Sequence, residues 1–217
     1  MKPQHHPDHS TLLAYAAGSI TESFSLLIAA HLEWCSECRA TVANAEDIGG
    51  HLLATQAKAE MSTTALTNIW NCIDNTPRLE QPRREIHPTN GLPTVLSQLF
   101  PDGMQKVKWS KLAPGIKQHK LPEIDSGAGT VRLLHIEQGI SIPNHTHLGT
   151  ELTFILQGSY SDKTGQYQRG DLSDVDNNLE HTPLVDSEQP CICLIATDEH
   201  LVFSNMFNKI MQPFFGM

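Results

Sequence analysis

Residues 139–158 read GISIPNHTHLGTELTFILQG, in which a glycine at either end encloses two histidines and a glutamate. His145 and His147 stand two positions apart, so in an extended strand both side chains point to the same side. Glu151 follows the turn at residues 148–150 and opens the next apolar run. Because imidazole and carboxylate groups suit zinc, manganese, iron or nickel, the stretch predicts a metal site without naming the metal.

The spacing G-x5-H-x-H-x3-E-x6-G resembles the first sequence motif of the cupin family, which implies an antiparallel β-barrel or jelly roll. The second cupin motif, G-x5-P-x-G-x2-H-x3-N, is matched more loosely by Gly170 and His181. Its proline, second glycine and closing asparagine are replaced by Asp176, Asn178 and Val185. Asparagine tolerates positive φ better than most residues, so the turn is expected to persist. The resemblance implies a divalent metal, with Zn²⁺ as the first choice, held by His145, His147, Glu151 and His181.

Short apolar runs predict that the rest of the second half is also built of strands. Glycine or proline interrupts most gaps between the runs, as in an antiparallel sandwich or barrel. The expected strands cover 105–112, 115–121, 130–137, 151–156, 170–175 and 191–196.

The first half has the pattern of helices instead. The expected helices cover 10–17, 21–28, 31–47 and 62–74, with Gly49 and Gly50 ending the third. Residues 76–94 carry four prolines and no apolar period, which predicts a linker. The sequence thus predicts an α plus all-β multidomain chain: a small helical bundle at 1–75, a linker at 76–94 and a cupin β-barrel or jelly roll at 95–217.

His31, Cys35 and Cys38 form an H-x3-C-x2-C string in the helical half. On one continuous helix, at about 100° per residue, the three side chains fall within an arc of roughly 60°. Thiolate and imidazole are ligands of tetrahedral zinc, and a structural zinc site takes four ligands. The candidates for the missing fourth are the N-terminal histidines His5, His6 and His9. The competing interpretation is a buried cysteine pair beside exposed histidines.

Longer segments resemble the ChrR-type zinc-binding anti-sigma family. They are AYAAG at 14–18, FSLL at 24–27, HLEWCSEC at 31–38, ELTFILQGSY at 151–160, LEHTP at 179–183, CICLIATD at 191–198 and QPFF at 212–215. The resemblance implies zinc ligands at His6, His31, Cys35 and Cys38. It further implies a helical domain that holds an extracytoplasmic-function-type sigma factor away from RNA polymerase. Release is then triggered by singlet oxygen or related oxidants acting through the cupin domain.

The charge balance excludes several classes of partner. The chain has 15 basic and 24 acidic residues, a formal net charge of −9. Direct nucleic-acid binding needs a basic face, and an anionic membrane surface is disfavoured for the same reason. No secretory core or bilayer-spanning stretch is visible, and the five cysteines are an odd number, so we expect a cytoplasmic protein. Residues 1–75 hold three bases and eight acids, which would complement a basic sigma factor.

Two features allow more than one interpretation. Leu66, Ile69, Trp70 and Ile73 form one helical face, which suits either a partner groove or packing on the protein's own core. Cys191 and Cys193 have strand periodicity and share a face, either as core residues or as a redox pair.

The sequence pattern is compatible with three functions. A zinc-dependent anti-sigma factor, which is not an enzyme, uses both metal motifs and the acidic helical head. A metal-dependent cupin enzyme, such as a dioxygenase or isomerase, would leave the H-x3-C-x2-C string without a role. A storage or structural cupin would have no partner and no response to oxidants. For the regulator, oxidation of Cys35 and Cys38 and a change at the cupin metal are both physical routes to release, and the sequence does not choose between them.

Overall fold

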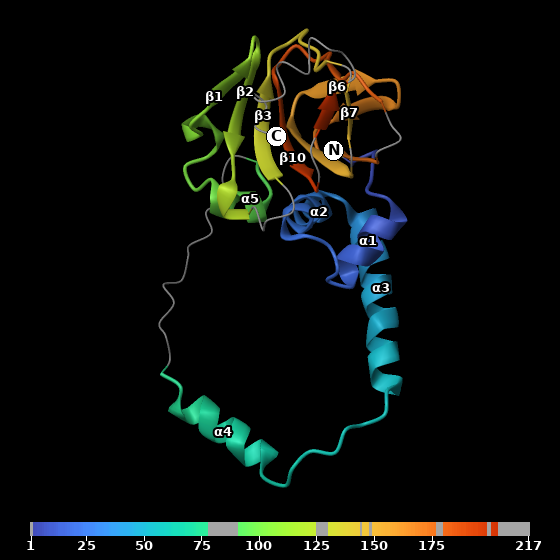
Figure 1. Cartoon of the computed structure of the whole chain (residues 1–217), viewed down its shortest axis with the longest axis vertical. Helices are drawn as coiled ribbons and strands as arrows, with labels where there is room; N and C mark the ends of the chain where they lie inside the picture. The colour runs from blue at the N-terminus through green and yellow to red at the C-terminus, as the bar shows by residue number, and fades with distance from the viewer. Residues whose placement is uncertain are drawn as a thin grey trace.

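A computed structural model describes residues 2–77, 91–124, 130–143, 145–147, 149–176, 180–198 and 201–203, with only the backbone of 123, 145–147 and 201–203. Within these ranges, helices come first and strands follow (Figure 1). The expected order of a helical part followed by an all-β part is confirmed. Most of the predicted linker, residues 78–90, and the QPFF segment lie outside the described residues.

Five α-helices are described. They are α1 (His9–Ala16), α2 (Glu22–Trp34), α3 (Ser36–Thr55), α4 (Ala65–Asn75) and α5 (Thr94–Leu99). The side chain of Thr21 caps α2 by accepting a hydrogen bond from the backbone nitrogen of Phe24. The carboxylate of Glu33 on α2 accepts from the backbone nitrogens of Thr94 and Val95, so α2 also caps the first turn of α5.

Two expected helix boundaries are wrong. His31, Cys35 and Cys38 do not share one helix, because α2 ends at Trp34 and Cys35 takes an extended conformation (φ −110°, ψ 104°) before α3 begins. The third helix also continues past Gly49 and Gly50 to Thr55. Glycine costs only about 1 kcal/mol relative to alanine in a helix, and the good helix formers on either side outweigh that cost here.

The second half forms antiparallel sheets. The strands are β1 (Ser110–Ala113), β2 (Ile116–Lys120), β3 (Thr130–Ile136), β4 (His145–His147), β5 (Glu151–Gln157), β6 (Ser159–Asp162), β7 (Gly165–Gln168), β8 (Leu172–Val175), β9 (Leu184–Val185), β10 (Cys191–Thr197) and β11 (Leu201–Phe203). A six-stranded sheet has the order β1-β2-β3-β10-β5-β8, a smaller sheet has the order β7-β6-β9, and β4 pairs with β11.

Five of the six expected strands lie within two residues of observed ones. The sixth, 105–112, is instead a 3₁₀ turn at Met104–Lys106 followed by β1. β4 coincides with the extended strand expected at His145 and His147. β6, β7, β9 and β11 lie outside the expected strands, because these short strands lack a long apolar run. Helix α5 was also not expected, since it begins at the last residue of the predicted linker.

Helix α2 lies against β5 and β10 at the centre of the large sheet (Figure 1). Leu27 and Ile28 of α2 share an apolar cluster with Phe154 of β5 and Leu194 of β10. The opposite side of the sheet packs into a second cluster that includes Ile155. Helix cover on one face and the small sheet on the other explain why β5 and β10 are buried along almost their whole length.

Helix α4 differs from the other helices because none of its residues is buried. Figure 1 shows it apart from both the remaining helices and the sheets. Cys191 and Cys193 lie together in the second cluster of the β-domain, on one strand face as expected. Across the described ranges, no helix has both the length and the apolar composition needed to cross a bilayer.

Candidate metal centre

Four side chains that can bind a metal converge where the N-terminus meets the α2–α3 junction. The ligand atoms of His6, His31, Cys35 and Cys38 all lie within 4.8 Å of one another. Nδ1 of His6 is 3.4 Å from Sγ of Cys35 and 3.3 Å from Sγ of Cys38. Two imidazoles and two thiols in this arrangement are a donor set that suits tetrahedral zinc.

The break between α2 and α3 brings the cysteines together. Because Cys35 leaves the helical conformation, its Sγ accepts a hydrogen bond from the backbone nitrogen of Cys38, at 3.4 Å, and caps α3. Nη1 of Arg39 donates to the carbonyl oxygens of Leu32 and Glu33, which end α2. A cation at this position satisfies carbonyl groups that the helix itself leaves unpaired.

His31 is oriented by the β-domain. Its ring is fully buried, and Nδ1 lies 2.9 Å from the carbonyl oxygen of Gly170, so Nδ1 carries the proton and donates it. Nε2 is buried without a hydrogen-bond partner. Burial lowers the pKa of His31 to about 4, although the bond to Gly170 opposes that shift. The ring is therefore neutral at physiological pH and has a lone pair on Nε2 for a metal ion.

The thiols are also in an apolar setting. Burial, together with the neighbouring thiol of Cys35, raises the pKa of Cys38 to about 12. A bound cation would reverse this effect, because only the thiolate is a metal ligand. The orphaned Nε2 of His31 and the buried thiol pair together indicate that the site fits a metal ion.

The structure also distinguishes the three N-terminal histidines. His6 points into the cluster, whereas the ring of His5 packs on Tyr167 with centroids 4.2 Å apart. His9 is exposed at the first position of α1. Of the three alternatives, only His6 reaches the two cysteines.

The predicted second metal site is described in part. Glu151 opens β5 and is buried, and its carboxylate accepts a hydrogen bond from Oγ1 of Thr153 at 3.2 Å. His181 is also buried, with Nδ1 3.0 Å from Oδ2 of Asp162. His145 and His147 form the two ends of β4, and their side chains lie outside the described part of the structure.

Asp162 is a hydrogen-bond partner of His181 that the sequence pattern does not predict. Burial acts to raise the pKa of Asp162. The hydrogen bonds from His181 and Thr164 outweigh burial and lower the pKa to about 2. The ionised carboxylate accepts a hydrogen bond from Nδ1 of His181 and fixes the orientation of its ring. Nothing in the sequence spacing links Asp162 to His181, because the antiparallel pairing of β6 with β9 in the small sheet brings the two residues together.

Comparison with known proteins identifies the family. The sequence pattern of the ChrR cupin-like domain matches residues 102–200. The anti-sigma-E factor ChrR of Cereibacter sphaeroides is 37% identical over 215 residues, which cover 99% of each chain. The chain belongs to the ChrR anti-sigma factor family. A crystal structure of Rhodobacter sphaeroides SigE in complex with the anti-sigma ChrR matches with a TM-score of 0.75 and 35% identity, over 91% of this chain and all of that one.

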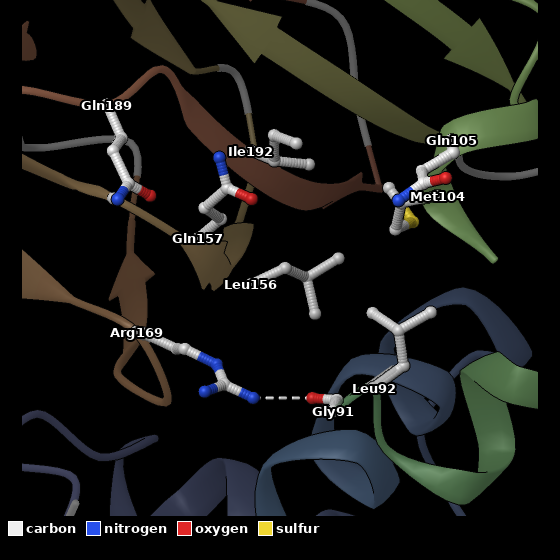
Figure 2. Close-up of a pocket in the computed structure, with 10 residues that line it drawn as sticks. Gly91, Leu92, Met104, Gln105, Leu156, Gln157, Arg169, Gln189 and Ile192 are labelled. Atoms are coloured by element: carbon white, nitrogen blue, oxygen red, sulfur yellow. Dashed lines mark hydrogen bonds between the residues drawn. The ribbon is translucent and has the colours of Figure 1, made fainter. Parts of the chain in front are cut away.

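This ChrR-family chain also has a cavity of about 570 Å³ beside the large sheet, between Leu92, Leu156 and Ile192 (Figure 2). Arg169 lies at its edge, where it donates a hydrogen bond to the carbonyl oxygen of Gly91 and stacks on the ring of Trp34. The ten residues that line the cavity include no carboxylate, imidazole or thiol. Its described lining therefore supplies neither a metal ligand nor an acid–base pair.

Proposed function

We propose that this ChrR-family chain is a zinc-dependent anti-sigma factor that sequesters an extracytoplasmic-function-type sigma factor in the cytoplasm. In this proposal residues 1–75 bind the sigma factor, 76–94 link the two parts, and the cupin-like domain at 95–217 senses the signal. The family assignment supports the proposal, because the relative of known structure is itself in complex with a sigma factor.

The observation that carries the proposal is the unpartnered apolar face of α4. Leu66, Ile69, Trp70 and Ile73 lie on one side of the helix and are 49–64% exposed. An apolar face of this kind, at helical spacing, is suited to a groove on another protein. Burying these side chains in a complex would remove apolar surface from water at roughly 1.5–3 kcal/mol for each fully covered residue. Among the described residues, no residue of α4 is buried, which supports the partner groove over packing on the protein's own core.

We propose that the exposed part of α3 is a second surface that contacts the sigma factor, in addition to the apolar face of α4. Its second half carries Ile48, Leu52 and Leu53, which are 58–76% exposed. Two exposed apolar helix faces on one chain, with the acidic balance of residues 1–75, fit a basic partner that is gripped from both sides.

Zinc at His6, His31, Cys35 and Cys38 would cross-link the N-terminal segment to the α2–α3 junction. Zinc binding contributes folding free energy directly in small domains of this type. The four ligands come from three separate segments, so metal binding would fix the arrangement of α1, α2 and α3 on which the α3 surface depends. Loss of zinc is therefore expected to release the partner.

We further propose that the cupin-like domain holds a divalent metal, Zn²⁺ by preference, at His145, His147, Glu151 and His181. Oxidative stress of the singlet-oxygen type would act on this domain and lead to release of the sigma factor. The buried Glu151, and the Asp162 carboxylate that orients His181, support a metal site there. A cupin enzyme is less well supported, because it has no use for α4 or for the cysteine cluster.

The experiment that tests this function is affinity purification of the tagged chain from the bacterium that produces it, with and without a strong zinc chelator. We expect one sigma factor to co-purify, and to be lost when zinc is removed. Recovery of a metal-loaded chain without any sigma factor from unstressed cells would contradict the proposal.

A further inference from the structure

The backbone of the N-terminal arm, defined as residues 3–8, is hydrogen-bonded to the β-domain, while the ring of His6 contacts the α2–α3 junction. Oδ1 of Asp171 accepts hydrogen bonds from the backbone nitrogens of Gln4 at 2.7 Å and His5 at 3.2 Å. Oδ2 of the same carboxylate accepts from the backbone nitrogen of Gln168 at 2.9 Å. Asp171 is fully buried, so its carboxylate depends on these three protein donors in place of water.

A further main-chain bond continues this attachment along the edge of the large sheet. The backbone nitrogen of Leu172, at the start of β8, donates to the carbonyl oxygen of His5 at 3.2 Å. Pro3 and Pro7 of the arm are both buried. The arm therefore covers an edge strand, and His6 projects from it toward Cys35 and Cys38.

The residue before Asp171 orients the second imidazole of the cluster. Gly170 has φ +95°, a backbone conformation that favours glycine, and its carbonyl oxygen is the acceptor for Nδ1 of His31. A Cβ built at this position would lie 3.4 Å from Pro3 and 3.5 Å from Trp34, in ordinary van der Waals contact, so the turn lies beside both the arm and α2. One turn of the β-domain thus contacts the two segments that carry His6 and His31.

We propose that the β7–β8 turn is the outer layer of the zinc site, in which Asp171 positions His6 through the N-terminal arm and Gly170 positions His31. The proposal rests on zinc being held by the four-residue cluster, and it concerns what keeps zinc there. Asp171 makes no hydrogen bond to a ligand side chain of the cluster among the described residues. It holds the backbone of the arm, and its negative charge also acts on His31.

Holding the arm is expected to slow the loss of zinc because it pre-organises the end of the chain that carries His6. The first residues of a domain are usually poorly ordered unless they are tied down, and ordering them costs backbone conformational entropy. Asp171 and β8 fix the arm in advance, so His6 is already in place when zinc binds. Partners outside the ligand shell typically change metal affinity by 10–100-fold when they are lost. The β-domain would then set how long the helices retain zinc.

The test measures the rate at which zinc leaves the purified full-length chain when excess chelator is added. Asp171→Asn keeps the size of the side chain but replaces one acceptor oxygen with an NH₂ group that faces a backbone N–H. The matched control is Asp186→Asn, since Asp186 accepts hydrogen bonds from Ser159, Ser161 and Gln166 and from no residue of the arm. Gln4→Pro is a second variant. It removes the backbone N–H that Gln4, an exposed residue of the arm, donates to Asp171, and it leaves Asp171 itself unchanged.

We expect Asp171→Asn and Gln4→Pro to release zinc about tenfold faster than the wild type, and Asp186→Asn to match the wild type. In a His6→Ala background, Asp171→Asn should add no further acceleration, because the ligand that it positions is absent. Equal rates of zinc release for the wild type, Asp171→Asn and Gln4→Pro would overturn the proposal. It would also be overturned if Asp171→Asn accelerated zinc release equally with and without His6. A wild-type chain that binds no zinc would instead overturn the proposed function on which it rests.

Discussion

Nδ1 of His31 lies 2.9 Å from the carbonyl oxygen of Gly170, although 139 positions separate the two residues. The contact joins the last turn of α2 to a turn of the β-domain and directs Nε2 of His31 to the cysteine pair. The helical part and the β-domain are therefore not independent units at this point. The candidate zinc site lies at their junction, where a change in either part can reach it.

Replacing Cys35 and Cys38 with serine removes two of the four proposed ligands, so we expect zinc at the cluster to be lost. Without the cross-link between the arm and the α2–α3 junction, sigma-factor binding should be abolished. Zinc content by atomic absorption and binding by calorimetry measure both effects. The matched control is Cys72→Ser, since Cys72 is exposed on α4 and is expected to leave the zinc content unchanged. Tight sigma binding by the double variant would contradict the zinc-clamp model.

Trp70→Ala and Ile73→Ala test the apolar face of α4. Both side chains are more than half exposed in the free protein, so truncation should change the free energy of unfolding by no more than about 0.5 kcal/mol. If the face is buried against the sigma factor, each change should weaken binding by at least about 1 kcal/mol, or several-fold in Kd. Asn68→Ala, on the opposite side of the helix, is the control. Unchanged affinity in both variants would exclude α4 from the interface.

Zinc affinity should depend on pH through Cys38. In the metal-free site its pKa is raised to about 12, so the thiol is protonated at neutral pH and must lose a proton when zinc binds. His31, with a pKa of about 4, is already neutral above pH 5 and releases none. We expect the affinity to rise by about tenfold or more per pH unit between pH 6 and 8. Competition with an indicator of known pH dependence measures this slope, and a flat profile would argue against thiolate coordination.

Phe154→Ala tests the shared core. Phe154 is fully buried on β5, and its ring centroid lies 5.5 Å from that of Trp34 and 6.2 Å from that of His31. The change should lower the free energy of unfolding by about 3–5 kcal/mol. Because the ring belongs to a cluster built from both parts, circular dichroism should show helix and sheet signals lost together in a single transition. Leu13→Ala, at an exposed position of α1, is the control. Independent unfolding of the helices would contradict the shared core.

Asp162→Asn tests the second metal site. The Asp162 carboxylate holds Nδ1 of His181, and we expect its loss to weaken metal binding at the cupin-like domain by about 10–100-fold. Metal per chain, measured after dialysis against a weak chelator, should fall from two toward one. The control is His119→Ala, a half-buried histidine of β2 that bonds to the carbonyl oxygen of Lys108. Two metals per chain in Asp162→Asn would remove the proposed role of Asp162.

The sequence was sufficient for the fold class and for picking out residues that the structure brings together near the α2–α3 junction. Periodicity distinguished the helices from the strands, and the H-x3-C-x2-C spacing selected three of the four converging residues. These residues do converge, but not on one continuous helix as the spacing predicts, since the chain breaks at Cys35. No glycine or proline marks this break, because a cysteine thiol serves as the cap.

What could not be predicted from the sequence depends on contacts across the fold. Asp171 and Gly170 belong to a β-turn, and their role at the cluster exists only because α2 and the N-terminal arm pack on that turn. Which of His5, His6 and His9 lies near the cysteines is also decided by contacts across the fold. The ring of His5 packs on Tyr167, and His6 is the histidine that reaches the cysteines. Local propensities and spacing carry no information about such long-range pairs.

The central claim is that zinc in the helical cluster controls sigma-factor binding, and titration of purified components tests it most directly. The Kd for the cognate sigma factor would be measured with the zinc-loaded chain, with the chain stripped by chelator, and after zinc is added back. The account predicts tight binding with zinc, a loss of at least a hundredfold without it, and full recovery on reloading. Equal affinity in the loaded and stripped states, with the cluster shown to be empty in the latter, would contradict it.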